Sequence, residues 1–439
     1  MTRTIREDPG RRGLLYAGTE TGIYVSLDDG ASWRSLQCNL PVAPIHDLIV
    51  KDNDLVVATH GRAFWILDDL SPLRQFREGA LSGPAHLFRP RTAVRLKTYG
   101  QGNRPPSLGK KNFRRIGPLV AAFYPTKQPT GEVIEEWLDA GKNPPIGVIV
   151  WYVLNGTPEG PLTLEFLDER GQLMQAFTSD APAAGRGGGA PADQGEGEEG
   201  LEEAEEVDEA RQHPTAQAGL NRFVWNMRCA DAIKVPGDSA TETAIAGPVA
   251  APGWYRVRLR VAAKTYEESV EIVKDPRVRA SREDLDAQFE LLLQIRDKLS
   301  ETHRAINALR ALRGQVDAWI GRSRRDEQAR AVTQAARDLH RALSAIEAEL
   351  LQVEAKSPLG PAAKLNAKLA TLAAFVDSAD AAPTKQAQEV FDDLSARIDA
   401  HLRRLEQITG AEAARFNELV RTSGVNALGV SPNLPAMPS

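Results

Sequence analysis

The chain has 439 residues, of which 42% are hydrophobic and 26% charged, an ordinary composition for a globular protein of about two to four domains. Its net charge of −5 comes from residues 193–209, which hold ten acidic residues and no Lys or Arg; the mildly basic remainder gives no reason to expect a nucleic-acid partner. No signal peptide follows Met1, and no apolar run approaches the roughly 20 residues of a membrane span. Cys38 and Cys229 are too few for a metal motif or a disulfide framework, and a single bridge between them stays open.

The beginning of the chain has the pattern of β-strands around one tight turn, residues 26–33 (SLDDGASW). The side chains of Ser26 and Asp28 can accept hydrogen bonds from the turn backbone, and Gly30 tolerates a positive φ. Trp33 is large enough to anchor the turn against a neighbouring sheet. The pattern therefore predicts a structural role for these four residues. Strand-like runs flank the turn at residues 14–19, 22–27 and 32–36.

A second copy of this pattern begins 40 residues further on. Residues 63–69 (AFWILDD) repeat the apolar spacing and paired aspartates of residues 23–29 (IYVSLDD), and this offset fits one propeller blade of about 40–50 residues. The pattern stops at Ser71-Pro72, as in the last blade of an array. Residues 1–72 are expected to form two terminal blades of an incomplete propeller, because closed propellers have at least about four blades. The missing blades are expected to belong to a longer protein or to a partner chain. Further strand-like runs lie at residues 46–51 and 55–59.

A connector is expected over residues 73–145. Its apolar runs predict short strands at residues 86–88 and 93–96. Residues 131–140 are expected to form a loop with a helical turn, before a proline-rich break.

Residues 146–275 alternate between apolar and polar side chains and are expected to form a β-sandwich that resembles small Ig-like or fibronectin-like modules. Trp225 and Trp254 are interpreted as anchors of its core. Residues 179–215 interrupt the sandwich with Ala, Gly, Pro and Glu. Such a segment cannot bury enough apolar surface to offset the entropy of ordering it, which predicts a disordered acidic loop.

From residue 276 the apolar residues recur at three- and four-residue steps, which predicts an antiparallel helical bundle over residues 276–425. Ser281 is a plausible N-cap for the first helix. His303 lies near the apolar stripe and is expected to be buried or at its boundary. A loose tail is expected at residues 426–439. The predicted helices cover residues 281–320, 326–353, 362–376, 384–408 and 411–420.

No catalytic motif is present: the sequence lacks H-E-x-x-H, G-x-S-x-G and a phosphate-binding loop. Adjacent carboxylates such as Asp28 and Asp29 point to opposite sides of a strand, and the histidines have no metal-ligand spacing. His60 and Arg62, between two predicted blade strands, are candidates for a ligand-contacting face, and Tyr24 is a further candidate from the propeller part. We therefore expect no catalytic set, no metal and no cofactor in this chain.

The order of parts resembles the C-terminal portion of large bacterial Asp-box (BNR-repeat) proteins with a sortilin-like or sialidase-like β-propeller, commonly labelled glycosyl hydrolases. The resemblance depends on the Asp-box pattern S-x-D-x-G-x-[ST]-W at residues 26–33, the end-blade segment 60–69, the Ig-like strands and the helical tail. It implies a secreted protein, periplasmic or extracellular, with a polypeptide or glycan partner. The leading interpretation is a noncatalytic interaction protein. The alternative is part of an exported glycoside hydrolase or sialidase-like enzyme whose catalytic residues lie in upstream blades.

Overall fold

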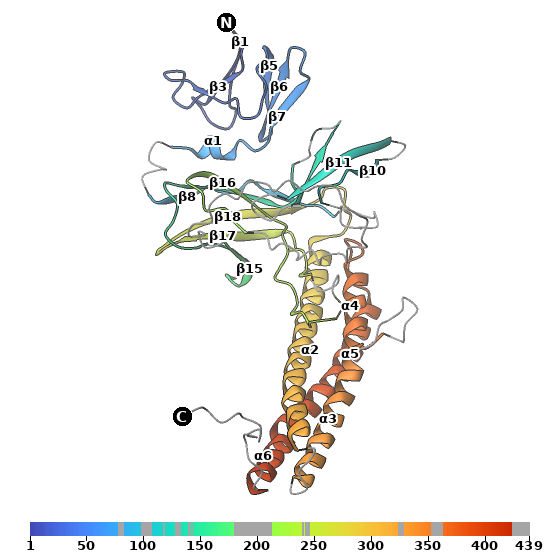
Figure 1. Cartoon of the computed structure of the whole chain (residues 1–439). Coiled ribbons are helices and arrows are strands. Elements are labelled where there is room, and N and C mark those ends of the chain that lie inside the picture. Colours follow the sequence, from blue (N-terminus) through green and yellow to red (C-terminus); the bar gives the residue numbers. More distant parts are fainter. Residues whose placement is uncertain are drawn as a thin grey trace, which may run out of the picture. The chain divides into compact units, whose positions relative to one another are not determined.

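The protein has a mixed β and α fold, with several antiparallel sheets and a C-terminal helical region (Figure 1). It divides into two compact units, one of residues 1–227 and 252–276 and the other of residues 228–251 and 277–439. Most of the predicted acidic loop and the predicted tail lie outside the described residues. The computed structural model describes residues 1–77, 83–97, 108–116, 119–127, 133–138, 141, 144–179, 213–238, 241, 246–323, 329–352 and 363–423.

Two antiparallel sheets form the N-terminal part of the first unit. Their strands, followed by a short helix, are β1 (Thr2–Glu7), β2 (Leu15–Thr19), β3 (Ile23–Ser26), β4 (Arg34–Ser35), β5 (Ile45–Lys51), β6 (Asp54–Thr59), β7 (Phe64–Leu67) and α1 (Ser71–Gln75). The strand orders are β1-β2-β3-β4 and β5-β6-β7. Tyr16 and Val25 of the first sheet share one buried cluster with Leu48, Leu55 and Val57 of the second. The strand predictions are confirmed here, whereas β1 and α1 were not predicted.

A second β-region of the first unit contains two sheets with a shared aromatic core. Its strands are β8 (Ala85–Leu87), β9 (Ala93–Arg95), β13 (Val148–Leu154), β14 (Leu162–Leu167), β15 (Leu173–Thr178), β16 (Gly219–Trp225), β17 (Gly253–Val261) and β18 (Lys264–Lys274). The sheet orders are β16-β13-β8 and β15-β14-β17-β18-β9. The Trp225 ring stacks on Phe166 of the other sheet, with centroids 4.3 Å apart. Phe223 contacts Phe177 of the other sheet in a tilted arrangement, with centroids 4.8 Å apart.

Two expectations for this region need correction. Trp225 is fully buried as predicted, but Trp254 is 45% exposed and lies near the guanidinium of Arg89. Successive side chains of a strand point to opposite faces, so Tyr255 takes the buried position in β17 and Trp254 takes the outer one. The strands β8 and β9 pair with β13 and β18, so they belong to these sheets and not to a separate connector.

A three-stranded sheet replaces the loop that was expected before the sandwich. It has the order β10-β11-β12, with β10 (Asn112–Ile116), β11 (Leu119–Lys127) and β12 (Val133–Trp137). The prediction of a helical turn within residues 131–140 is wrong for β12, whose described residues pair with β11. The rings of Phe123 and Trp137 lie 4.9 Å apart across this pair, and such cross-strand aromatic contacts stabilise a sheet.

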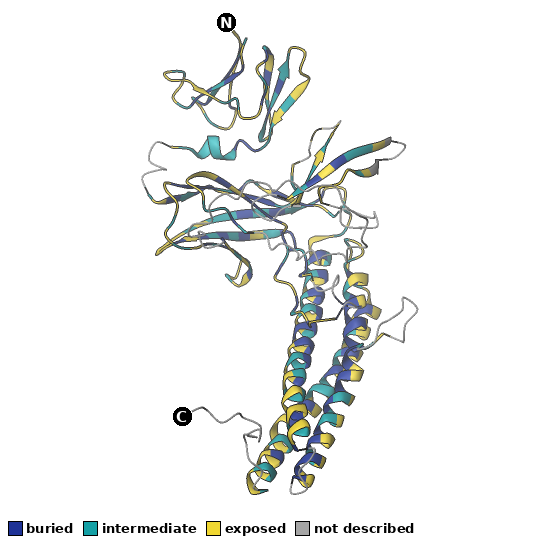
Figure 2. Ribbon diagram, viewed as in Figure 1, coloured by how far each residue is buried: buried dark blue, intermediate teal, exposed yellow. Residues whose placement is uncertain are grey.

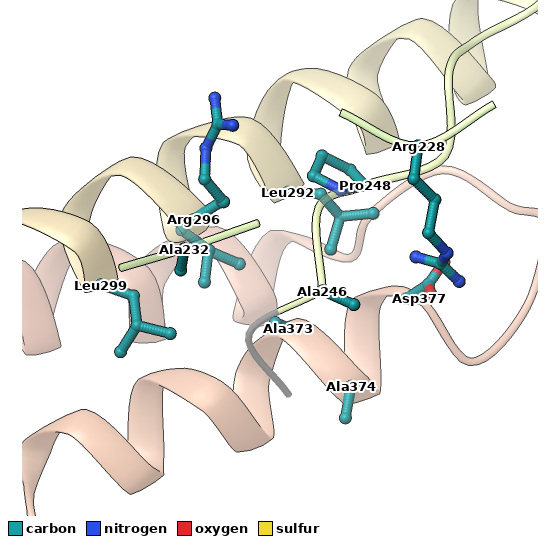
Figure 3. A pocket seen from close by; sticks show the side chains of 11 residues that line it. Arg228, Ala232, Ala246, Pro248, Leu292, Arg296, Leu299, Ala373, Ala374 and Asp377 are labelled. Carbon is teal, nitrogen blue, oxygen red and sulfur yellow. The ribbon is translucent and has the colours of Figure 1, made fainter. Parts of the chain in front are cut away.

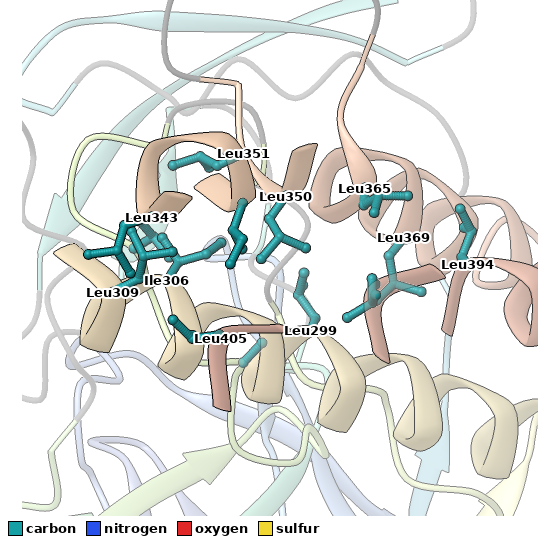
Figure 4. Close-up of a cluster of buried hydrophobic side chains, with 14 of the residues drawn as sticks. Leu299, Ile306, Leu309, Leu343, Leu350, Leu351, Leu365, Leu369, Leu394 and Leu405 are labelled. Carbon is teal, nitrogen blue, oxygen red and sulfur yellow. The ribbon is translucent and has the colours of Figure 1, made fainter. Parts of the chain in front are cut away.

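The helical region consists of α2 (Arg282–Ser323), α3 (Arg330–Leu350), α4 (Leu365–Val376), α5 (Lys385–Gln407) and α6 (Ala413–Thr422), which follows a π-helical turn at Ile408–Glu412. The predicted helices are confirmed to within a few residues at each end. Ser281 and Asp284 cap α2 reciprocally, each accepting a backbone N–H from the other, at 2.9 and 3.1 Å. Leucines from α2, α3, α4 and α5 meet in one core (Figure 4), and buried positions recur along each helix (Figure 2). His303 is fully buried, as expected.

Residues 228–238, here called the strap, fold with the helices although the sequence pattern places them in the sandwich. Ala232 and Val235 of the strap join the helical core. Four α2 side chains, spaced by seven, four and three residues and hence on one helix face, bind strap carbonyls. These contacts are Arg296 to Ala230 (2.7 Å), His303 to Ile233 (2.5 Å), Asn307 to Lys234 (3.0 Å) and Arg310 to Pro236 (2.8 Å).

Candidate functional site

The structure brings the predicted turn residues together after β3. The Asp28 carboxylate accepts hydrogen bonds from the Ser26 hydroxyl at 2.7 Å and from both the backbone and the hydroxyl of Ser32. The Gly30 N–H donates to the Ser26 hydroxyl at 2.8 Å, and Gly30 has a φ of 88°. The bonds from Ser32, followed by the one from Ser26, lower the pKa of Asp28 to about 2. The carboxylate is thus occupied in holding the turn.

Trp33, the expected anchor of this turn, makes a hydrogen bond to the turn itself. Its indole N–H donates to the Gly30 carbonyl at 3.1 Å, and the residue is 38% exposed. The ring therefore closes over its own turn. Indole groups at the surface commonly combine such a hydrogen bond with an exposed apolar face.

The turn between β6 and β7 contains the two residues predicted for a ligand-contacting face. Arg62 is exposed, and its backbone receives the indole N–H of Trp65 at 2.9 Å and donates to the Thr59 hydroxyl at 3.2 Å. His60 is also exposed and stacks on His46, with ring centroids 4.9 Å apart and an interplanar angle of 26°. Sequence reasoning missed His46. The register of the β5–β6 hairpin is what brings the two histidines together. Ile45, just before His46, pairs with Thr59, just before His60.

A buried ionic cluster connects α1 to both N-terminal sheets. The Asp8 carboxylate lies 2.9 and 3.1 Å from Nε of Arg74 and accepts the Tyr16 hydroxyl at 3.2 Å. Arg74 also donates to Asn53 in the β5–β6 turn, at 2.5 Å. Burial raises the pKa of Tyr16 above its usual range. Asp8, Tyr16 and Arg74 each bind another member of the cluster, so the cluster has a structural role: it holds α1 against the two sheets. Asp8 and Arg74 are 66 positions apart in the sequence, so no local sequence pattern could predict that they pair.

The outer face of the sheet β5-β6-β7 is largely apolar and exposed. Ile49, Val56 and Ile66 form one cross-strand row. Ala58 and Phe64 form the next row together with Asp47, which pairs with Arg6. The exposed fractions are 75% for Phe64, 58% for Ile66 and 56% for Ile49, and exposed positions alternate with partly buried ones along β7 (Figure 2). The inner face of the same sheet is packed against the first sheet. The sheet therefore has two apolar faces, of which one is covered within the described residues.

A cavity of about 310 Å³ lies in the helical unit (Figure 3). Arg296 at its edge donates to the Ala230 carbonyl at 2.7 Å and lies 2.6 Å from Asp297. Arg228 and Asp377 point toward one another at the other side. The size fits a small ligand, but the guanidinium of Arg296 is already engaged by the protein. The remaining lining is mainly apolar and comprises Ala232, Ala246, Pro248, Leu292, Ile295, Leu299, Ala373 and Ala374.

His303 belongs to a buried polar cluster beneath the strap. Its Nδ1 lies 2.5 Å from the Ile233 carbonyl, which assigns the proton of the neutral ring to Nδ1. Its Nε2 has no hydrogen-bond partner and is 4.0 Å from the carboxylate of Asp238. Asp238 in turn accepts from Thr241 at 2.6 Å and from Asn366 at 2.7 Å. Burial lowers the pKa of His303, and this effect outweighs the opposing contributions of Ile233 and Asp238.

The stability of the helical unit is expected to fall as the pH drops below about 6.5, the ordinary pKa of histidine. The lowered pKa of folded His303 means that the unfolded chain takes up a proton first, so acid favours unfolding through this group. A His303→Gln variant, whose amide can still donate to Ile233, should have a flatter dependence of unfolding free energy on pH. Urea titrations between about pH 7.5 and 5.5 measure it, and parallel curves for the two proteins would disprove the assignment.

Comparison with known proteins identifies no relative. No family model matches the chain, and neither the curated proteins nor the solved structures contain a significant match. None of the helices in the described part of the chain is long and apolar enough to cross a membrane. Within the same residues, no group of three or more His, Cys, Asp or Glu side chains is arranged to hold a metal ion. Cys38 and Cys229, both described, are not joined in a disulfide.

Proposed function

We propose that this chain is a noncatalytic interaction part of a larger β-propeller protein of the Asp-box, sortilin-like or sialidase-like type. Two observations support the comparison with propeller blades. The sheets β1-β2-β3-β4 and β5-β6-β7 pack through one apolar cluster, as neighbouring blades do. The segments that repeat in sequence, residues 23–29 and 63–69, contain the third strand of each sheet.

The exposed apolar face of β5-β6-β7 carries the proposal. Burying a large apolar side chain contributes about 1.5–3 kcal/mol, so covering Ile49, Phe64 and Ile66 would stabilise an assembly substantially. The occupant we propose is a further sheet of the same kind from the full-length protein. A sheet fits because the opposite face of β5-β6-β7 already packs on a sheet through alternating apolar side chains.

The remaining parts fit an exported binding protein. In this proposal the two sheets with the Trp225 core form an Ig-like or fibronectin-like module, and the helices form an antiparallel bundle. His60 and Arg62 would lie on the face that meets a polypeptide or glycan partner. Any glycoside hydrolase activity would then depend on residues of other blades, because Asp28 is engaged by its own turn.

Hydroxyl-radical footprinting tests the covered face. In the 439-residue chain, Phe64 should be oxidised readily because it is 75% exposed. In the native protein purified from its source, oxidation of Phe64 should be severalfold slower, and its mass by native mass spectrometry should exceed 47.8 kDa. Phe375 of α4, at 60% exposure, is the matched control and should react similarly in both samples.

Three outcomes decide the proposal. A heavier native chain with protected Phe64 supports a blade from the same protein. A native chain of 47.8 kDa within a larger assembly, again with protected Phe64, would indicate that a partner chain, and not a blade of the same protein, covers this face. Equal oxidation of Phe64 in both samples would refute the docking face.

A further inference from the structure

The stacked pair of His46 and His60 has the chemistry of a metal-binding site. Both imidazoles are exposed, and their ring centroids are 4.9 Å apart. The backbone beneath them is held by the β5–β6 ladder and by a hydrogen bond from the His60 N–H to the Pro44 carbonyl at 2.8 Å. The two side chains are therefore presented side by side from a fixed backbone.

We propose that His46 and His60 together bind a divalent transition-metal ion, with zinc as the reference ion and copper or nickel as close analogues. Neutral imidazole is a favoured ligand of these ions. With Zn–N bonds of about 2.0–2.1 Å, two nitrogens of a tetrahedral site lie about 3.3 Å apart. The ring centroids are 4.9 Å apart and both side chains are exposed, so rotation of the side chains would bring two ring nitrogens to this separation.

The surroundings leave the other coordination positions to water. The Glu20 carboxylate is held by Arg3 at 3.0 and 3.2 Å. Asp47 is held by Arg6 at 2.7 Å. The site is thus an open two-histidine site. It does not rest on the proposed propeller role, because it depends only on contacts of the β5–β6 hairpin.

Other histidines are placed differently. The Nδ1 of His303 is engaged by the Ile233 carbonyl within the buried core, and His340 lies 3.3 Å from Asp317. His401, on α5 of the other unit, has partial exposure and provides a matched control.

Isothermal titration of the metal-stripped 439-residue protein with zinc chloride tests the site. The wild-type chain should bind one zinc ion here, and His46→Ala and His60→Ala should each bind about tenfold or more weakly, because each loses one of two metal bonds. The double variant should lose zinc binding at this site, since neither of the two metal bonds remains. His401→Ala should bind as the wild type does.

Two further measurements keep the result interpretable. Thermal melts of the variants should match the wild type, because both side chains are exposed. Copper added to the wild type should give an electron paramagnetic resonance spectrum with coupling to imidazole nitrogen, and this coupling should be lost in the double variant. If the double variant bound zinc as tightly as the wild type, the proposal would be wrong. The zinc would then be bound by other groups, such as the acidic residues 193–209.

Discussion

Replacing Glu347 by Gln is expected to destabilise the helical unit by about 3–5 kcal/mol, the usual cost of removing one partner from a buried ion pair. The Glu347 side chain is only 2% exposed. One carboxylate oxygen lies 2.6 Å from Nε of Arg310, and the other contacts Arg313. The substitution keeps the shape of the side chain but leaves two guanidinium groups of α2 without their shared anion. Denaturant unfolding followed by helical circular dichroism measures the loss.

Glu349 provides the control for this experiment. It lies two residues further along α3, is exposed, and faces Lys364 at 3.7 Å. Glu349→Gln should change the unfolding free energy by about 0–1 kcal/mol, as is usual for a surface pair. If Glu347→Gln were as mild as this control, the two arginines would have to be stabilised by solvent and not by Glu347.

Replacing Asp8 by Asn is expected to cost a similar 3–5 kcal/mol in the first unit. The Asp8 side chain is fully buried, and Arg74 is largely so. Without the carboxylate, Arg74 keeps Asn53 and the Asp52 carbonyl but loses its counter-ion, and the Tyr16 hydroxyl loses a charged acceptor. Both N-terminal sheets should therefore be loosened. Fluorescence-detected unfolding and amide hydrogen exchange of residues 1–77 would follow the change.

Asp47→Asn is the matched substitution for this second experiment. Asp47 pairs with Arg6 at 2.7 Å, but both side chains are about half exposed, so its loss should cost no more than about 1 kcal/mol. Similar effects for Asp8→Asn and Asp47→Asn would indicate that the buried cluster is not what joins α1 to the sheets.

Local patterns predicted local structure well, because periodicity and caps act over a few residues. The α2 start at Ser281 follows from its reciprocal cap with Asp284, and the strands around the Asp28 turn follow from alternation and Gly30. The face of a strand is harder to predict when both faces carry large apolar residues. In β17 the neighbours Trp254 and Tyr255 are both able to fill a core, and only the assembled sheets select Tyr255.

Long-range partners account for most of what the sequence left open. The pairing of His46 with His60 depends on the hairpin register, and that of Asp8 with Arg74 depends on where α1 packs. Neither register nor packing is encoded by residue spacing alone. The same reason explains β12, whose partner strand had not been recognised, so its residues were interpreted as a loop.

The strap has a consequence for how this protein can be dissected and synthesised. The helical unit needs residues 228–251, which are made before β17 and β18, as well as residues 277–423. A fragment that starts at residue 277 would lack Ala232 and Val235 and would leave His303 without its carbonyl partner. The core of the helices is therefore complete only when residues 228–251, which are translated earlier, pack against them. Folding of the two units is coupled through the covalent chain, and no single cut can separate them as two intact domains.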